Sequence, residues 1–348
     1  MIIVTGATGR LGRAVVERLA ERAPAEQLGV SVRDPEKAAD LAARGIRVRR
    51  GDFGDPVALA HALEGAAQVL LVSGPADPEP HRVAIDVAKA AGAKRIVYTS
   101  HQAASPDSLF VATRGHAASE QDLAESGVPF TSLRNGFYAS TTVYLLRSAL
   151  ETGELILPED GPVSWTAHQD LTEAATIALI DPNRLAGLTP TDPNRLAGLT
   201  PTDPNRLAGL TPTGPERLAG LTPTDPNRLA GLTPTDPNRL AGLTPTGPER
   251  LAGVTPALTG QELFDYADVA ALVTDLTGRK VTRVTVPDEE WRQTAIAHGM
   301  PEFAADLTLG IFAAARRGEF AVVDPTLPTL LDRPTTTLRD VLTQELTL

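Results

Sequence analysis

The sequence predicts an α/β fold of the Rossmann type: a doubly wound parallel sheet with a small C-terminal, substrate-side lobe and a repeat insertion. One observation is an apolar strand over 2–5 that runs directly into Gly6, Gly9 and Gly12. Another is the regular alternation of strand-like and helical segments that follows, which is typical of doubly wound sheets. The third is size, because a chain of 348 residues, 42% of them hydrophobic, can bury a full α/β core.

Each of the three glycines has a role where the first strand meets the helix after it. Gly6 allows a tight turn, Gly9 lets backbone N–H groups approach a pyrophosphate, and Gly12 lets the helix pack closely on the strand. The N-terminus of that helix favours the negative charge of a phosphate. The pattern therefore predicts a nicotinamide dinucleotide site. Its predicted contacts are Gly6, Thr8, Gly9, Arg10, Leu11 and Gly12.

The N-terminal half alternates short apolar runs with helical patterns. Strands are predicted over 2–5, 28–32, 46–49, 69–73, 95–99 and 130–134, and a strand-like segment over 254–258 follows in the second half of the chain. Helices are predicted over 11–22, 35–44, 56–64, 78–91 and 112–126. Ligands of such sheets bind at the carboxyl ends of the strands, so the residues that follow each strand are the candidates for a site.

Composition excludes several classes of function. The formal net charge of −11 gives no support for binding to nucleic acid or to an anionic membrane surface. Without cysteine there are no disulfides, no thiolate metal site and no cysteine nucleophile, and we predict no metal centre. No apolar run has membrane-spanning length, and a strand that starts at Ile2 leaves no room for a signal peptide. We therefore expect a soluble cytoplasmic protein.

A tandem repeat interrupts the second half of the chain. The 11-residue unit that begins with Asp181-Pro-Asn-Arg-Leu-Ala-Gly occurs seven times and ends at Ala257. We accordingly divide the chain into a dinucleotide-binding domain (1–157), the remaining Rossmann elements with the lobe (158–180 and 258–348), and an inserted array (181–257). Each copy has only two leucines, or one and a valine, which makes a thin core for a stacked solenoid, so a mobile surface excursion is the preferred interpretation. A third interpretation is that the array binds a partner protein.

The residues after the second strand bear on the choice of cofactor. Arg33 suits the 2′-phosphate of NADP, which a guanidinium can grip bidentately, and Arg10 and Arg13 could add to that grip. Asp34 keeps NAD open as an alternative, because a carboxylate there would bind the ribose hydroxyls. We therefore predict NADP(H) as the preferred cofactor, with NAD(H) as the alternative.

Three further strand ends supply candidates. Asp52 and Phe53 would flank the adenine, and the turn at Ser73 and Gly74 would let backbone approach the ribose. After the fifth strand, two hydroxyls and an imidazole would lie near the nicotinamide end of the site. These belong to Thr99, Ser100 and His101.

On these residues the chain resembles the NmrA-like atypical short-chain dehydrogenases/reductases, a group that includes type 2 NAD(P)H:quinone oxidoreductases. The resemblance covers nearly everything except 181–246. The segments that carry it are 6–12, 33–37, 51–53, 98–101, 126–138, 287–291 and 333–338.

The resemblance implies a reductase that lacks the usual acid. Short-chain dehydrogenases use Tyr-x-x-x-Lys to protonate a carbonyl oxygen, but this chain has Ala112 and His116 at those positions. A quinone accepts hydride readily and water can protonate the product, so such a site needs chiefly to position its reactants. The resemblance thus implies hydride transfer from NADPH to a quinone-like small molecule.

His116 is expected to hold the nicotinamide ribose as the lysine would, with Glu120, four residues later on the same helix face, to orient it. Candidate catalytic residues are His116, Ser100 and Tyr138. The predicted substrate pocket is His101, Asn135, Phe137 and Tyr138.

A non-catalytic alternative fits the missing Tyr-Lys pair equally well. NmrA-like proteins include regulatory sensors that bind the dinucleotide and change partners with its redox state. The sequence leaves both functions open, and with them the physiological acceptor and the oligomeric state.

Overall fold

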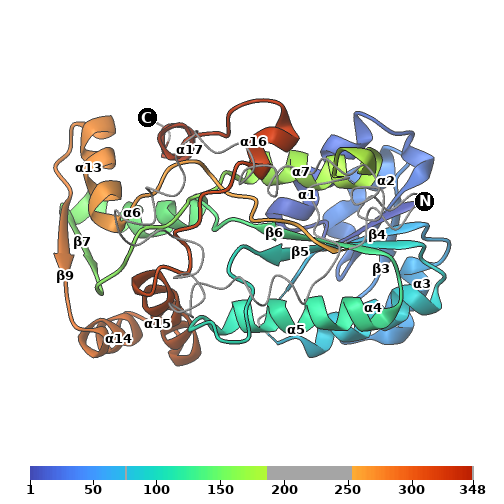
Figure 1. Ribbon diagram of the computed structural model, residues 1–348, viewed down its shortest axis with the longest axis horizontal. Helices are drawn as coiled ribbons and strands as arrows, with labels where there is room; N and C mark the ends of the chain where they lie inside the picture. Colours follow the sequence, from blue (N-terminus) through green and yellow to red (C-terminus); the bar gives the residue numbers. More distant parts are fainter. Residues whose placement is uncertain (75–76, 186–252, 347–348) are drawn as a thin grey trace, which may run out of the picture.

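The computed structural model describes residues 1–74, 77–185 and 253–346, and in these it confirms the predicted parallel sheet (Figure 1). The seven strands are ordered β3-β2-β1-β4-β5-β6-β8, and every neighbouring pair is parallel. Their bounds are β1 Ile2–Thr5, β2 Leu28–Val32, β3 Arg47–Arg50, β4 Gln68–Leu71, β5 Arg95–His101, β6 Phe130–Asn135 and β8 Gly253–Val254.

The strand order reverses between β1 and β4, which is where open α/β sheets bind their ligands. Strand β4 ends two residues earlier than predicted, because the backbone N–H groups that follow it donate to side chains instead of to the backbone of a neighbouring strand. The hydroxyl of Thr5 accepts the N–H of Val72, and that of Thr99 accepts the N–H of Ser73. Side-chain oxygens from two neighbouring strands therefore shape the switch point.

Helices cover both faces of the sheet (Figure 1). On one face α1 packs against α7, and a core cluster that includes Leu11, Val15 and Leu171 lies beneath them. On the other face α3, α4 and α5 pack in sequence over a second cluster that includes Ile85 and Leu123. Their bounds are α1 Arg10–Ala20, α2 Ala39–Ala43, α3 Pro56–Leu63, α4 Glu79–Ala90, α5 Val111–Ser126 and α7 His168–Ile180.

The C-terminal lobe has its own hydrophobic cluster, rich in aromatic side chains such as Trp165, Tyr266 and Phe312. A two-stranded parallel sheet, β7 and β9, lies at its outer end (Figure 1). The elements are α6 Ser140–Thr152, β7 Glu154–Leu157, α13 Tyr266–Thr277, β9 Thr282–Thr285, α14 Asp288–Ala297, α15 Glu302–Arg316, α16 Thr326–Leu331 and α17 Leu338–Glu345. Within the described ranges, no helix is long and apolar enough to cross a membrane.

Both ends of the repeat array belong to the folded unit. In the first copy, Pro182–Leu185 form a 3₁₀ turn and Leu185 is fully buried. In the last copy, Gly253–Val254 form strand β8 beside β6. The rest of the array, 186–252, lies outside the described residues, and so do the solenoid, surface-excursion and partner-binding interpretations.

Candidate active site

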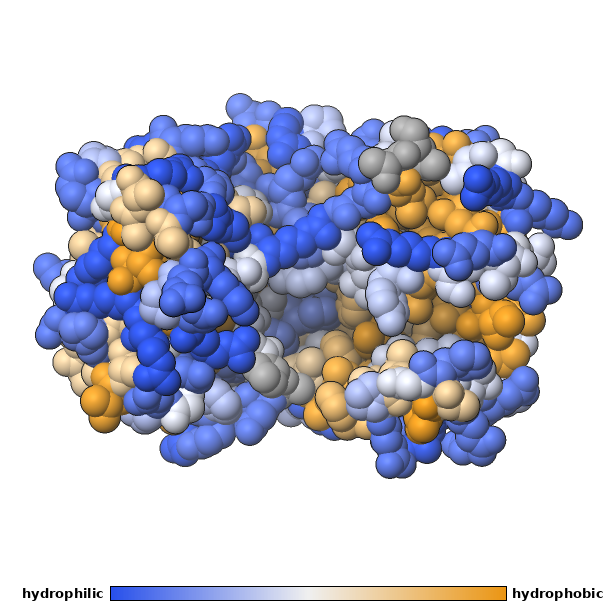
Figure 2. Space-filling model, turned by 180° about the vertical axis from the view of Figure 1, so that it is seen from behind, coloured by the Kyte–Doolittle hydropathy of each residue, from blue (hydrophilic) through white to orange (hydrophobic). Residues whose placement is uncertain are grey.

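The carboxyl ends of the strands in the large sheet face the C-terminal lobe (Figure 1). Figure 2 shows the molecule from behind, and its surface is hollowed in the middle, where the two parts meet. The residues predicted after each strand therefore gather along one edge, as parallel strands require.

The glycine loop at the end of β1 has a backbone that requires two of its three glycines. Gly6 has a φ of +60°, which side chains disfavour. A Cβ on Gly12 would lie 2.5 Å from the carbonyl oxygen of Gly6, so α1 can pack this closely only with glycine there. A Cβ on Gly9 would lie 3.3 Å from the same oxygen, a contact that small shifts relieve. The fold therefore demands Gly9 less than it demands the other two.

The first turn of α1 offers N–H groups toward this loop. Its N-cap, Gly9, has an extended backbone and provides no side-chain cap. N–H groups at an uncapped helix N-terminus suit the oxygens of a phosphate. The loop and helix thus fit a dinucleotide pyrophosphate.

Arg33 and Asp34, at the end of β2, have different surroundings. Arg33 is exposed, and among the described residues its guanidinium has no hydrogen-bond or ion-pair partner. Asp34 caps the 3₁₀ turn Pro35–Ala38 by accepting the N–H of Glu36 at 3.2 Å, and it lies 3.8 Å from the ammonium of Lys37. The carboxylate is therefore engaged locally, which fits a 2′-phosphate site better than a ribose-diol site.

Arg10 and Arg13 were predicted to bind the 2′-phosphate together with Arg33, but both pair with carboxylates instead. The guanidinium of Arg10 pairs with Glu345 of α17, and that of Arg13 pairs with Glu17 and Asp40. Carboxylates already neutralise both cations, so neither is a ready phosphate ligand in this conformation.

The turns after β3 and β4 are held by local hydrogen bonds. Asp52 accepts the N–H of Gly54 at 2.9 Å, and the Phe53 ring lies edge-on to the imidazole of His81, with ring centroids 6.2 Å apart. His81 in turn accepts the N–H of Gly74 at its Nε2, at 3.0 Å. This buried histidine of α4, which the sequence does not single out, fixes the Gly74 turn.

A second unpredicted residue, Tyr98 on β5, holds His116. The Tyr98 hydroxyl lies 2.8 Å from Nδ1 of His116. Burial lowers the pKa of His116 to about 3 and raises that of Tyr98, so at neutral pH both are uncharged. His81 accepts the Gly74 N–H at Nε2, so its own proton is on Nδ1, 3.5 Å from the Tyr98 oxygen, and the phenol proton is left to donate to Nδ1 of His116. The His116 proton is then on Nε2.

Glu120 does not orient His116, contrary to the sequence prediction. Its carboxylate pairs with Arg134 at 2.7 Å and accepts the hydroxyls of Ser100 and Ser132 at 2.7 and 2.9 Å. Residue spacing on α5 is right for a contact with His116, but the partly buried guanidinium of Arg134 on β6 is the stronger partner of the Glu120 carboxylate. Because the Ser100 hydroxyl already donates to a buried carboxylate, we do not assign Ser100 a catalytic role.

The predicted pocket residues fall into two groups. His101 and Phe137 are in edge-to-face contact, with centroids 5.5 Å apart, and the His101 ring stacks at 6.1 Å on that of His116. Tyr138 instead packs on the His168 ring at 4.2 Å, on the side of the molecule where α1 and α7 lie. Burial raises the pKa of the Tyr138 phenol, and the neighbouring Asn135 opposes that rise.

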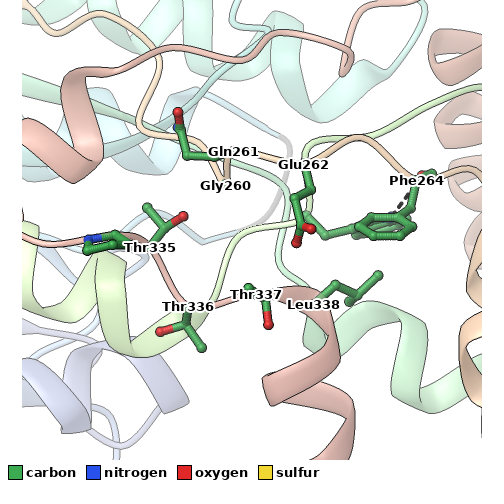
Figure 3. Close-up of a pocket in the computed structure, with 10 residues that line it drawn as sticks. Gly260, Gln261, Glu262, Phe264, Thr335, Thr336, Thr337 and Leu338 are labelled. Carbon is green, nitrogen blue, oxygen red and sulfur yellow. Dashed lines mark hydrogen bonds between the residues drawn. The ribbon is translucent and has the colours of Figure 1, made fainter. Parts of the chain in front are cut away.

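A separate cavity of about 160 Å³ lies in the C-terminal lobe and contains none of the predicted site residues (Figure 3). Trp165 and Phe264 line one side, and the segment from Pro334 to Leu338 lines another. Trp165 also contacts Phe137, with centroids 5.6 Å apart. Through Trp165 the cavity therefore borders a cluster of phenylalanines, Phe110, Phe137 and Phe320, which we call the aromatic wall.

Comparison with known proteins gives consistent matches. The NAD(P)H-binding family matches residues 6–152. Quinone oxidoreductase 2 of Escherichia coli (strain K12) is 43% identical over 180 residues, 50% of this chain and 62% of that protein. An NmrA-like family domain-containing oxidoreductase of Aspergillus flavus is 31% identical over 199 residues, 54% of this chain and 65% of that protein. The aligned parts thus span less than two thirds of these two relatives.

A solved structure matches over the whole length. The NADPH-dependent quinone oxidoreductase QOR2 of Escherichia coli, complexed with NADPH, superposes with a TM-score of 0.74 at 28% identity, covering 99% of each chain. The predicted Rossmann fold is thereby confirmed. The chain is thus similar to NAD(P)H-binding and NmrA-like oxidoreductases, quinone oxidoreductases among them.

Proposed function

We propose that this protein transfers hydride from NADPH to a small, planar, quinone-like acceptor, without an amino-acid side chain as the essential acid. The observation that carries the proposal is His116, held neutral by burial and by Tyr98 at the carboxyl edge of the sheet, in place of a charged lysine. A neutral imidazole with its proton on Nε2 can donate a hydrogen bond but is a poor source of a proton. That suits a reaction limited by positioning.

Different residues of the chain would bind different parts of the dinucleotide. The glycine loop (Gly6, Thr8, Gly9) and the first turn of α1 would bind the pyrophosphate, Arg33 would bind the 2′-phosphate, and His116 would donate to the nicotinamide ribose. When bound, the cofactor supplies the hydride. NAD(H) would bind more weakly, because Asp34 is engaged as a cap.

Further contacts of the cofactor remain proposals. Asp52 and Phe53 would flank the adenine, Ser73 and Gly74 the ribose. Phe137 and Tyr138 would border the acceptor from opposite sides. The aromatic wall would exclude water from the reacting atoms.

The test is an assay of NADPH oxidation with 1,4-benzoquinone, run beside a measurement of NADPH binding. Saturable, quinone-dependent oxidation is the expected result. Tight binding of NADPH without turnover on any of several quinones would overturn the proposal and support a redox sensor instead.

A further inference from the structure

Three buried polar atoms at the carboxyl ends of β5 and β6 have no hydrogen-bond partner among the described residues. They are Nε2 of His101 and both amide atoms of Asn135, whose amide interacts with the Tyr138 phenol without meeting hydrogen-bond geometry. The two residues are partners in the parallel register, and the backbone oxygen of Asn135 accepts the N–H of Gln102 at 2.8 Å. Buried polar atoms are nearly always paired, so an unpaired group of this kind calls for a ligand.

The state of the His101 imidazole follows from its one hydrogen bond. Its Nδ1 accepts the backbone N–H of Ala103 at 3.1 Å, so the proton of the neutral ring is on Nε2. Burial lowers the pKa of His101 to about 3, with smaller effects from His116 and Arg134, so the ring is neutral. Nε2–H is therefore a fixed donor.

Aromatic rings surround this donor. Phe137 and Phe320 lie edge-on to the imidazole at 5.5 Å, and Phe110 lies at 6.4 Å. Phe320 comes from the C-terminal lobe and is fully buried. In such a setting of low polarity, a hydrogen bond to a developing charge is stronger than it would be in water.

We propose that His101 Nε2–H and the amide N–H of Asn135 form a two-donor subsite for the carbonyl oxygen of the acceptor. This assignment rests on the proposed hydride transfer. The acceptors that fit this subsite are planar molecules whose reduction puts negative charge on an oxygen. A fixed pair of donors stabilises that charge without reorganising as it forms.

The electron balance is that of an ordinary two-electron reduction. As the C–H bond at C4 of the nicotinamide breaks, hydride forms an O–H bond at one quinone oxygen and an electron pair moves through the ring to the other oxygen, so the products are the hydroquinone monoanion and NADP⁺. The new negative charge resides on the oxygen held by His101 and Asn135. Water then protonates that oxygen, and neither side chain gives up a proton.

Two variants of His101 separate the donor from the packing. His101→Asn keeps an oxygen where Nδ1 accepts the Ala103 N–H but has no donor at the position of Nε2. His101→Gln places an amide N–H close to the position of Nε2. We expect His101→Asn to lower kcat/KM for 1,4-benzoquinone about a hundredfold, and His101→Gln to retain most of the activity.

A cationic triphenylmethane dye serves as the second acceptor. Its central carbon takes hydride and the product is neutral, so no oxygen gains charge. His101→Asn should therefore slow quinone reduction much more than dye reduction, so that the ratio of the two rates falls at least about tenfold. If neither acceptor is reduced by the parent protein, the proposed function fails. If both are reduced and His101→Asn slows them equally or not at all, the subsite fails, and the ring faces of the phenylalanines are the partner of Nε2–H.

A binding measurement without NADPH gives a second readout. The ionised form of 4-nitrophenol has its own absorbance, so the fraction ionised on the protein can be measured directly. The parent protein and His101→Gln should bind the phenolate preferentially and lower the apparent pKa of the ligand. No such shift in the parent, or the same shift in His101→Asn and Asn135→Leu, would overturn the subsite.

Discussion

At the residue scale, we propose that the contrast between Arg33 and Asp34 sets the cofactor preference of the site. Both follow β2. The Asp34 carboxylate caps the next turn and lies near Lys37, whereas the Arg33 guanidinium has no partner among the described residues. We expect Arg33→Ala to lower the NADPH/NADH affinity ratio roughly ten- to a hundredfold, the value of one charge-assisted contact of about 1.5–3 kcal/mol. Titration of each dinucleotide measures it, with Arg339→Ala on α17 as the matched control. An unchanged ratio would remove Arg33 from the site.

Tyr98 is predicted to act through His116 as a positioning residue. Tyr98→Phe removes the hydroxyl that donates to Nδ1 but keeps the ring, so the imidazole loses the bond that fixes its proton on Nε2. We expect Tyr98→Phe and His116→Ala each to raise KM for NADPH and to lower kcat modestly. In steady-state kinetics the double variant should be no worse than His116→Ala, because interacting residues are not additive. Additive losses would show that Tyr98 acts independently.

Sequence reasoning located the strand-end residues but not their partners. Parallel strands place their carboxyl ends on one edge, so a residue such as His101 could be assigned to that edge from the order of elements alone. Which side chain meets His116 depends on how α4, α5 and β5 pack together. Helical spacing favoured Glu120 as the partner of His116. The Glu120 carboxylate instead pairs with Arg134 of β6, and the Tyr98 hydroxyl contacts His116.

At the scale of elements, variants of the glycine loop and of α1 distinguish a glycine that ligand binding requires from a glycine that the fold requires. We expect Gly9→Val to fold and to lose dinucleotide binding, because its backbone is extended and its Cβ meets only one oxygen at 3.3 Å. Gly12→Ala should destabilise the protein itself, since its Cβ would lie 2.5 Å from backbone. Thermal unfolding and NADPH titration of both variants test this. Full binding by a folded Gly9→Val would exclude the loop from the cofactor site.

Strand bounds came out close to prediction where apolar runs were unambiguous, as in β1 and β2. The end of β8 differs from its predicted position. A strand over 254–258 was expected, but only Gly253–Val254 pair regularly with β6, and Leu258 returns as an isolated bridge to Asn135. Composition alone cannot predict where a short edge strand leaves its neighbour.

At the scale of the whole molecule, one buried and three partly buried histidines make stability depend on pH. Burial lowers the pKa of His81 and His168 to about 4 and that of His101 and His116 to about 3. An unfolded histidine binds its proton near pH 6.5, so between about pH 6.5 and 4 the unfolded chain holds more protons. The free energy of unfolding should therefore fall on acidification, by up to about 1.4 kcal/mol per pH unit for each such histidine.

Urea unfolding at pH 7, 6 and 5 measures this dependence. His101→Asn provides the comparison, because it removes one of the four groups and should flatten the slope. A parent whose stability is constant over this range would contradict the burial of these imidazoles.

The repeat array is predicted to be dispensable to the fold and to the chemistry. Deleting 186–251 removes six copies and leaves one complete unit, which keeps buried Leu185, strand β8 and the hydrogen bond from Arg184 to the Leu330 oxygen. Loop-closure entropy grows slowly with length, so stability should change by only about 1–2 kcal/mol. Circular dichroism, unfolding and NADPH titration check the trimmed chain. Failure to fold would show that the array is a packed structural element.

The central claim is hydride transfer on the protein, and a single-turnover experiment tests it most directly. Protein in excess is loaded with NADPH carrying deuterium at the transferred position of C4 and is mixed with 1,4-benzoquinone, and the absorbance of reduced nicotinamide is followed beside the unlabelled reaction. We predict complete oxidation in one turnover, slower with the labelled cofactor because its C–D bond breaks in the step observed. Bound NADPH that stays reduced in the presence of quinone would contradict the account.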